Sequence, residues 1–354
     1  MNWIGASDAS KRGKIRAKRN RAEQDGANAG VAGDAGEWPM KYPLLAIVGP
    51  TASGKSDVAL HIAQELGGEI ISADSMQVYR YFDIGTAKPS KEEQSLVRHH
   101  LIDIVEPDET YNAAQFAADV SRIVPEIVSR GHLPILAGGT GLYVRAAVSG
   151  FLFPSPGRDE QYRRTLELEA EIHGNEYLWE QLQKVDPVSA ARIHTNDRVR
   201  IIRALEVYQQ SGLPVSQHAE RHTKNSDRYN CLMVCLNRDR AELYERINLR
   251  TEKMLAAGWV SETQSLVAKG YDINKGPLAA LGYAEIVNYL YGKSTWEETV
   301  ELIKRNTRRF AKRQLTWFRR EEDAIWIDLT GRSTAEVSAQ ISTMLEGRSI
   351  RSGE

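Results

Sequence analysis

The residues most suited to chemistry in this chain lie in the stretch GPTASGKS, which spans residues 49–56 and follows the apolar run LLAIV. In a G-x-x-x-x-G-K-S loop between a strand and a helix, the glycines let backbone N–H groups converge on phosphate oxygens. The lysine can reach a terminal phosphate, and the last serine can bind Mg²⁺. We therefore predict a diphosphate-binding loop, with Ser56 as the metal ligand, formed by Gly49, Pro50, Thr51, Ala52, Ser53, Gly54, Lys55 and Ser56.

A second motif of nucleotide-hydrolysing enzymes is weak in this sequence. Such enzymes normally carry an apolar strand that ends in an aspartate for Mg²⁺. The segment HHLIDIV, with Asp103, is a poor match to this pattern, and no guanine-reading motif is evident. The loop thus predicts a ligand with a diphosphate or a longer phosphate chain, and it does not by itself predict a nucleotide.

Polar residues follow two further predicted strands. IISADSMQVYR places Asp74 and Ser75 after the strand at 68–73, and LPILAGGTGLY places Thr140 after the strand at 133–138. Ligands of open parallel sheets lie beyond the carboxyl ends of the strands. Each residue alone would also suit a helix N-cap. Two such strand ends beside one phosphate loop favour a site.

The helix predicted at 241–257 carries two arginines near its apolar side. At 100° per residue, its apolar face consists of Leu243, Ile247 and Met254. Arg250 falls inside this arc, and Arg246 lies at its edge. Charges are rarely fully buried without partners. The two arginines therefore face either a diphosphate, which we favour, or a carboxylate of the core.

The helix predicted at 296–320 has one basic side. Its apolar side is formed by Val300, Ile303, Phe310, Trp317 and Phe318. The opposite side carries Arg305, Arg308, Arg309, Lys312, Arg319 and Arg320. No acidic residue occurs from 304 to 320. A solvated face usually mixes the two signs of charge, so we favour RNA contact over plain solvation. The candidate RNA ligands are Arg309, Lys312, Arg313 and Gln314.

These motifs belong to a predicted α/β fold. Short apolar strands alternate with helices, which is typical of a parallel sheet. After the boundary FPSPG the pattern is helical, until CLMVCLN at 231–237 returns to a strand. We predict a P-loop NTPase-like parallel sheet core with a mostly helical insertion domain. The predicted parts are a disordered N-terminal extension at 1–40, the core at 41–150 and 228–330, the insertion at 151–227, and a C-terminal tail at 331–354.

Bulk properties restrict the function classes. The 354 residues have a formal net charge of −1, so any surface for nucleic acid must be local. No apolar run approaches the roughly 20 residues of a membrane span. The start of the chain has no apolar core of a secretory signal. Two cysteines do not make a disulfide framework. We expect a cytoplasmic protein that does not contact a membrane.

Seven segments, in this order, resemble the tRNA dimethylallyltransferase family: GPTASGKS, ISADSMQVYRYFDIGTAKPS, HHLIDIVEP, AGGTGLY, RIHTNDRVRIIRALEVY, LGYAEI and AKRQLTWFRR. The resemblance extends from about residue 44 to 320. It implies transfer of a dimethylallyl group from dimethylallyl diphosphate to the exocyclic amine of the adenosine 3′ of the anticodon in tRNA, giving isopentenyladenosine. It further implies Mg²⁺ as cofactor and the tRNA anticodon stem-loop as partner.

The resemblance also assigns roles to individual residues. Asp74 would be the general base, and the implied catalytic set is Asp74, Thr140, Lys55, Arg246 and Arg250. The implied tRNA contacts are Asp74, Ser75, Met76, Gln77, Thr140, Arg163, Val199, Arg200, Ile201, Ile202 and Arg203. Val199 replaces a polar residue of the family pattern.

Two other functions fit parts of the sequence. One is a P-loop kinase of small molecules, which ATP turnover without a prenyl donor would reveal. The other is an RNA-binding protein with a relic phosphate loop. The intact Lys55, Ser56 and Asp74 count against the relic. We expect the enzyme to be a monomer.

Overall fold

The structure is a computed structural model that describes residues 41–149, 157, 159–222 and 228–348. The predicted disorder of residues 1–40 lies outside the described residues. Within the described ranges, no helix combines the length and the apolar character needed to cross a bilayer.

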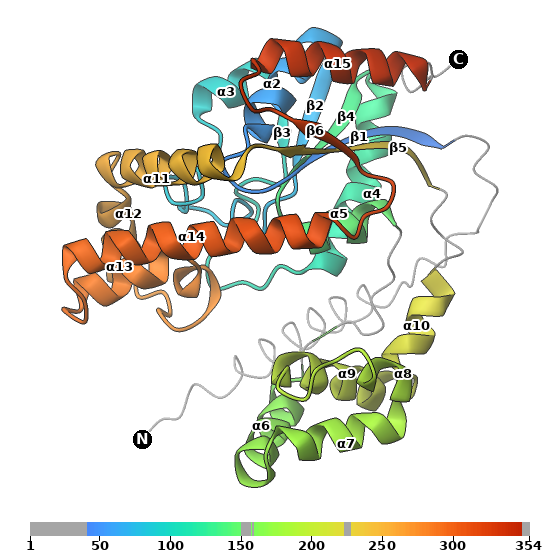
Figure 1. The fold of residues 1–354 in the computed structure, drawn as a ribbon, viewed down its shortest axis with the longest axis vertical. Coiled ribbons are helices and arrows are strands. Elements are labelled where there is room, and N and C mark those ends of the chain that lie inside the picture. The colour runs from blue at the N-terminus through green and yellow to red at the C-terminus, as the bar shows by residue number, and fades with distance from the viewer. Residues whose placement is uncertain (1–40, 150–156, 158, 223–227, 349–354) are drawn as a thin grey trace, which may run out of the picture. The chain divides into compact units, whose positions relative to one another are not determined.

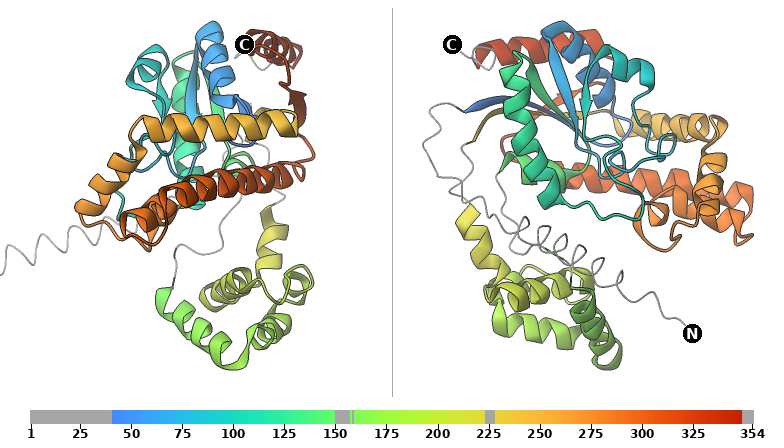
Figure 2. Two further views of the ribbon diagram at one scale, coloured as in Figure 1. Left: turned by 60° about the vertical axis from the view of Figure 1, so that its left-hand side comes forward. Right: turned by 180° about the vertical axis from the view of Figure 1, so that it is seen from behind.

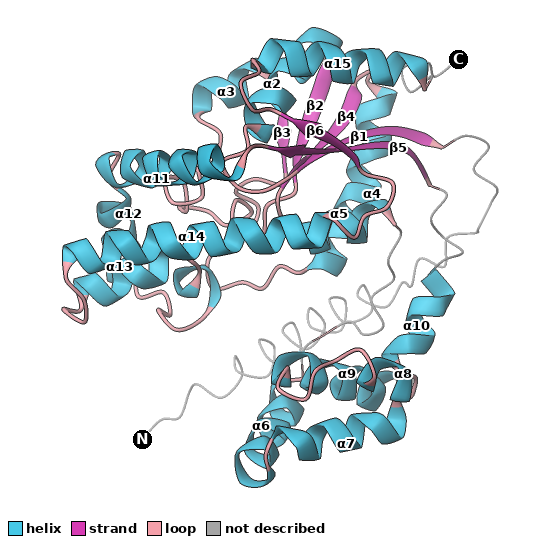
Figure 3. Cartoon of the chain, in the orientation of Figure 1, coloured by secondary structure: helices cyan, strands magenta, loops and turns pink. Residues whose placement is uncertain are grey.

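The core is a six-stranded, fully parallel sheet with the order β3-β2-β4-β1-β5-β6 (Figures 1 and 3). This confirms the predicted parallel α/β core. Its strands are β1 (Tyr42–Val48), β2 (Gly68–Ser72), β3 (His99–His100), β4 (Leu133–Gly138), β5 (Tyr229–Asn237) and β6 (Ile325–Asp328).

Helices cover both faces of this sheet. Because successive side chains of a strand point to opposite faces, Leu45 and Ile47 of β1 face one helical layer, whereas Leu44 and Ala46 face the other. The first layer is formed by α2 (Lys55–Leu66) and α15 (Thr334–Gly347). The second layer is formed by α4 (Ala113–Ser129) and α5 (Gly141–Val148). The short helix α3 (Lys91–Leu96) precedes β3.

The predicted C-terminal tail at 331–354 is wrong for most of its length. Residues Thr334–Gly347 form α15, whose Val337, Ile341 and Leu345 are fully buried against the sheet and α2. A capping box starts this helix, in which Ser333 accepts from the Glu336 backbone and Glu336 from the Ser333 backbone. The strand β6, which we did not predict, extends the sheet beyond β5. The core therefore continues to residue 347.

Residues 159–222 form helices with a core of their own. These are α6 (Glu160–His173), α7 (Asn175–Val185), α8 (Pro187–Ala190), α9 (Arg198–Ser211) and α10 (Val215–His222). Apolar residues of α6, α7 and α9, such as Leu166, Leu182 and Leu205, are buried together. The described range 159–222 consists of these helices and the turns between them, which agrees with the predicted mostly helical insertion.

A second group of helices follows β5. It consists of α11 (Arg240–Ala256), α12 (Trp259–Ala268), the 3₁₀ helix η1 (Gly276–Ala279), α13 (Tyr283–Leu290) and α14 (Trp296–Phe318). Helices α11 and α14 lie side by side below the carboxyl ends of the strands (Figures 1 and 2). They begin within one residue of the predicted positions 241 and 296.

Candidate functional site

The predicted phosphate loop connects β1 to α2. Gly49 has φ 147°, and a Cβ atom there would lie 2.3 Å from the carbonyl oxygen of Leu236, so no side chain fits at this position. Gly54 has φ 100° and precedes the first residue of α2 in the left-handed region that favours glycine. The loop thus turns tightly into a helix N-terminus, whose free N–H groups and partial positive charge suit an anion.

Three cationic side chains of the predicted site meet this loop. Lys55 Nζ donates to the Pro50 carbonyl at 3.2 Å, and Arg246 Nε donates to the Ala52 carbonyl at 2.9 Å. Arg250 donates to the Thr51 hydroxyl at 3.2 Å. Both arginines of α11 therefore lie against the loop, and their contact with a diphosphate stays a prediction. Neither forms an ion pair with a carboxylate among the described residues.

Arg238 also contacts the loop, and the sequence did not single it out. Its Nε donates to the Ser53 carbonyl at 2.9 Å. Unlike Arg246 and Arg250, it is neutralised by a short ion pair with Glu242 and also donates to the Leu329 carbonyl. We therefore assign Arg238 to holding the loop in place.

The charges at the loop influence one another. Burial, with a smaller contribution from the Arg250 charge, lowers the pKa of Lys55 to about 8. Burial also lowers the pKa of Arg250. The Asp74 carboxylate acts against both shifts. The crowding of positive charge, with one nearby carboxylate, is suited to a ligand of higher negative charge.

Asp74 and Thr140 come together at the adjoining strand ends. The Ser75 N–H donates to Thr140 Oγ1 at 3.0 Å, and the Thr140 N–H donates to the Ala73 carbonyl at 3.1 Å. Asp74 Oδ1 accepts from the Met76 N–H at 2.8 Å. Among the described residues, no hydrogen bond uses Asp74 Oδ2. One carboxylate oxygen is therefore fixed and the other is available as a proton acceptor.

The alternative that these residues are helix caps is not supported. No helix follows Asp74, whose bond to Met76 is an Asx turn. Thr140 precedes α5, but its side chain makes no capping hydrogen bond. Its hydroxyl instead binds the segment that carries Asp74.

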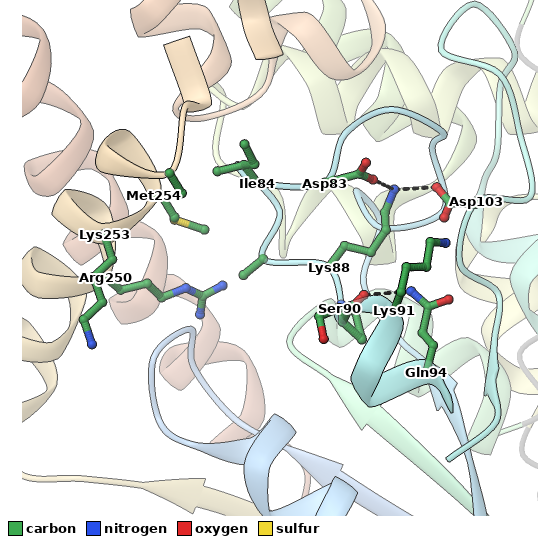
Figure 4. A pocket seen from close by; sticks show the side chains of 13 residues that line it. Asp83, Ile84, Lys88, Ser90, Lys91, Gln94, Asp103, Arg250, Lys253 and Met254 are labelled. Atoms are coloured by element: carbon green, nitrogen blue, oxygen red, sulfur yellow. Dashed lines mark hydrogen bonds and ion pairs between the residues drawn. The ribbon is translucent and has the colours of Figure 1, made fainter. Parts of the chain in front are cut away.

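The neighbouring loop at residues 83–89 borders a cavity. Lys88 is nearly buried and pairs with Asp83 at 2.7 Å and Asp103 at 2.5 Å (Figure 4). Asp103, the weak metal candidate, is thus engaged by a lysine. Arg250 extends from α11 into the cavity, on the side opposite Lys88. The cavity has a volume of about 430 Å³, and its apolar lining includes Ile84, Ala87, Pro89, Met254 and Ala257.

Glu262 of α12 shapes that loop and was missed by sequence reasoning. Its carboxylate accepts from the backbone N–H groups of Asp83, Ile84 and Gly85 at 2.8–3.2 Å. It also accepts from the Tyr283 hydroxyl at 2.6 Å. No local sequence pattern signals a contact between positions so far apart in the chain.

The Gln77 side chain likewise forms hydrogen bonds within the protein. Its Oε1 accepts from the Ser72 hydroxyl at 2.8 Å, and its Nε2 donates to the carbonyls of Thr86 and Ala87. Met76 is half-buried beside an apolar cluster. The contact of Met76 and Gln77 with tRNA stays a prediction.

The predicted RNA ligands on α14 differ in their exposure to solvent. Arg309, Lys312 and Arg313 are exposed and form no ion pair in the described ranges. Gln314 is only 7% exposed: its Oε1 accepts from the Thr51 N–H and its Nε2 donates to the Gly139 carbonyl, both at 2.9 Å. Both ends of the Gln314 amide are thus used inside the protein, and its contact with RNA stays a prediction.

The predicted RNA-contacting segment of α9 contains both exposed and buried side chains. Val199 is 75% exposed and Arg200 is exposed. Ile201 and Ile202 are 0% and 4% exposed, so a side-chain contact with tRNA is wrong for both. They pack in the core of the helical part, as apolar residues on the inner side of an amphipathic helix do.

Arg163 and Arg203 have an acidic partner. Arg163 donates two hydrogen bonds to Glu206, at 2.8 and 2.7 Å, and Arg203 donates one at 2.5 Å. Burial favours a higher pKa for Glu206, but the hydrogen bonds from the two arginines outweigh it and lower the pKa to about 2. The bonds from Arg163 join α6 to α9, whereas Arg203 lies on α9 together with Glu206. The contact of both arginines with tRNA stays a prediction.

Comparisons with known proteins agree with this arrangement. The IPP transferase family model matches residues 77–321. A tRNA dimethylallyltransferase of Symbiobacterium thermophilum is 52% identical over 303 residues, 84% of this chain and 94% of that protein. The crystal structure of a tRNA isopentenylpyrophosphate transferase from Bacillus halodurans is 42% identical, with a TM-score of 0.65, and the match covers 87% of this chain and 98% of that one.

A more distant structure shares the fold. It is a eukaryotic dimethylallyltransferase captured while acting on tRNA, 27% identical, with a TM-score of 0.72 over 86% of this chain and 78% of that one.

Proposed function

The chain belongs to the IPP transferase family and is a tRNA prenyltransferase, and we propose that it transfers the dimethylallyl group of dimethylallyl diphosphate to the exocyclic amine of the adenosine 3′ of the anticodon. One observation carries the proposal: a phosphate loop contacted by Lys55, Arg246 and Arg250 lies at the same end of the sheet as the Asp74–Thr140 pair.

The donor side of this proposal rests on charge. The diphosphate leaves only if its negative charge is neutralised, and Lys55, the loop amides, Arg246 and Arg250 supply positive charge there. As the C–N bond to the adenine forms, the bond between the allylic carbon and the diphosphate oxygen breaks. The two arginines are prearranged on oxygens of the loop that would hold the leaving group.

Ser56 fits a Mg²⁺ ion bound together with the donor. It is exposed at the start of α2, and its hydroxyl makes no hydrogen bond within the described part of the chain. Mg²⁺ usually takes one or two protein oxygens and completes its octahedron with substrate phosphates and water. The described residues contain no cluster of three or more His, Cys, Asp or Glu side chains for a metal. When bound, the ion neutralises diphosphate charge.

The acceptor side depends on Asp74. An adenine amine is a weak nucleophile, and a carboxylate that takes its proton during attack lowers the barrier. Asp74 Oδ2 is available for that proton, while Oδ1 is held by the Met76 N–H. The target base has to leave its stack to reach such a site. We assign the tRNA anticodon stem-loop to the exposed cations of α14. We further propose that the protein acts in the cytoplasm as a monomer.

The activity is tested by incubating the full chain with labelled dimethylallyl diphosphate, Mg²⁺ and bulk tRNA, followed by nucleoside analysis. We expect label in isopentenyladenosine. ATP turnover without the prenyl donor would instead support a kinase, which no observation favours.

The role of Asp74 is tested by Asp74→Asn. The asparagine oxygen still accepts from Met76, so the free energy of unfolding should hardly change, whereas the proton acceptor is lost. We expect a single-turnover rate lower by roughly 10²–10⁴ at saturating substrates. A loss below about tenfold would remove Asp74 from the base role.

A further inference from the structure

Gln314 connects the two halves of the proposed site. It lies on α14, yet its amide reaches the Thr51 N–H in the phosphate loop and the Gly139 carbonyl after β4. The adjacent Thr140 binds both flanks of Asp74, through the Ala73 carbonyl and the Ser75 N–H. A short series of hydrogen bonds therefore leads from the loop, through Gln314, to the segment that carries Asp74.

The chemistry of both partners fixes the orientation of this amide. A backbone N–H only donates and a carbonyl only accepts, so Oε1 must face Thr51 and Nε2 must face Gly139. The fit is also tight, because a Cβ atom on Gly139 would lie 2.3 Å from Nε2. Among the natural side chains, glutamine supplies an acceptor and a donor at this reach without adding charge.

The sheet alone does not fix the tip of the loop. The register pairs Val48 with Gly138, but Thr51 lies three residues beyond the end of β1. Helix α14 supports the tip at two positions on its inner face, where Ala311 is buried in one cluster with Ala52 and where Gln314 binds Thr51. By contrast, the end of β4 is closely packed on the segment before Asp74, since a Cβ atom on Gly138 would lie 2.2 Å from the Ala73 carbonyl oxygen.

We propose that Gln314 is a positioning residue for the transfer reaction: it sets the distance between the loop that holds the diphosphate and the segment that holds Asp74. This inference rests on the proposed function. Gln314 does not touch the reacting atoms. Its effect arises because attack in line with the departing diphosphate requires the two substrates in register, and a misplacement of about 1 Å can cost about 100-fold in rate.

The inference predicts a separation of rate from affinity. Each half of the site keeps its own binding groups when Gln314 is replaced, so each substrate still binds, but the pair is no longer held in register. A direct tRNA contact by Gln314 predicts the reverse, a weaker affinity for tRNA with a normal rate once tRNA is saturating.

The test compares Gln314→Met with Asn306→Leu. Methionine has nearly the shape of glutamine and makes neither hydrogen bond. Asn306 is the matched control, because it is a half-buried amide on the same helix that donates to Glu285 and not to the loop. We measure the single-turnover rate at saturating substrates, the Kd of tRNA and the Kd of dimethylallyl diphosphate. Gln314→Met should lose about 100-fold in rate with each Kd changed less than about threefold, and Asn306→Leu should transfer normally.

A second readout does not depend on the reaction. Hydrogen exchange of the free enzyme should be faster in Gln314→Met than in the wild type in peptides that cover residues 49–56, because the Thr51 N–H loses its acceptor. Wild-type label transfer is measured first, so that failure of the proposed function is distinguished from failure of this inference.

Three results would overturn the inference: a wild-type rate in Gln314→Met, unchanged exchange in residues 49–56, or a tRNA Kd raised while the saturated rate is kept. If Gln314→Met melts below the assay temperature, Gln314→Glu decides. Glutamate keeps the size and the acceptor for Thr51 but cannot donate to Gly139 when ionised. A folded Gln314→Glu with a wild-type rate would equally contradict the positioning role.

Discussion

Helices α11 and α14 run side by side and both carry arginines, but they use them differently (Figure 2). Arg246 and Arg250 of α11 point inward and bind oxygens of the phosphate loop. We call them, with Lys55, the inward cations. Arg309, Lys312 and Arg313 of α14 are exposed. We call these three the outward cations.

The difference in exposure between the two sets of cations suits them to two kinds of phosphate ligand. The inward cations are partly shielded from water, and this burial, with a smaller contribution from the Arg250 charge, lowers the pKa of Lys55. Such a site suits a small ligand with dense charge. The outward cations remain hydrated and screened, which suits many weak contacts to an RNA backbone. Similar residue types thus suit the prenyl donor on α11 and the tRNA acceptor on α14.

The largest expected effect comes from removing an inward cation. Lys55→Ala deletes the cation that the phosphate loop itself carries, and we expect transfer to fall by about 10²–10³. The Kd of tRNA should stay close to the wild-type value, because the outward cations are untouched. Transfer is measured in single turnover and tRNA affinity by filter binding, with the exposed Lys293→Ala as control. An equal loss of tRNA affinity would remove the distinction between the two sets.

A smaller effect should follow from pH. Lys55 carries its charge below its pKa of about 8 and loses it above. In the free enzyme, kcat/KM for the donor should therefore decrease as pH rises through about 8, approaching tenfold per pH unit. Bound diphosphate favours the charged lysine, so the decline in kcat should occur at higher pH. A flat kcat/KM profile across that range would show that the Lys55 charge does not contribute to donor capture.

The smallest effect on transfer is expected for the outward cations. Arg309→Ala combined with Lys312→Ala should weaken tRNA binding and reduce the slope of log affinity against log salt by about 0.7–0.9 for each lost phosphate contact. The single-turnover rate at saturating tRNA should hardly change. A salt titration with an unchanged slope would return this face of α14 to plain solvation.

Much of the site follows from local sequence, because its geometry is local. The phosphate loop is a contiguous motif, and the angle of Arg250 on its helix already places it on the apolar side. Gln314 needed the same calculation: it lies within about 40° of Ile303 and Phe318 around α14. This angle predicts that Gln314 faces the interior of the protein, where its amide binds the phosphate loop. The resemblance included Ile201 and Ile202 in an RNA segment although their apolar character predicts burial.

Other features required tertiary information. The three hydrogen bonds to Glu262 join residues 83–85 to α12, and no spacing rule connects them. Helix α15 is different, because its signal was present in the sequence. Ser333 and Glu336 match a capping box, and Val337, Ile341 and Leu345 repeat every four residues.

The position of β1 in the middle of the sheet affects how the chain can be synthesised. Its register pairs Leu44 with Cys231, and the whole helical part lies between these two residues in the chain. At about 5–20 residues per second, a ribosome needs roughly 10 to 40 s to supply β5 after β1 has emerged. During that time β1 exposes a strand edge lined by Leu45 and Ile47, residues that the finished fold buries completely. Chains that end within the helical part are therefore expected to aggregate through this edge, which only the later strand can protect.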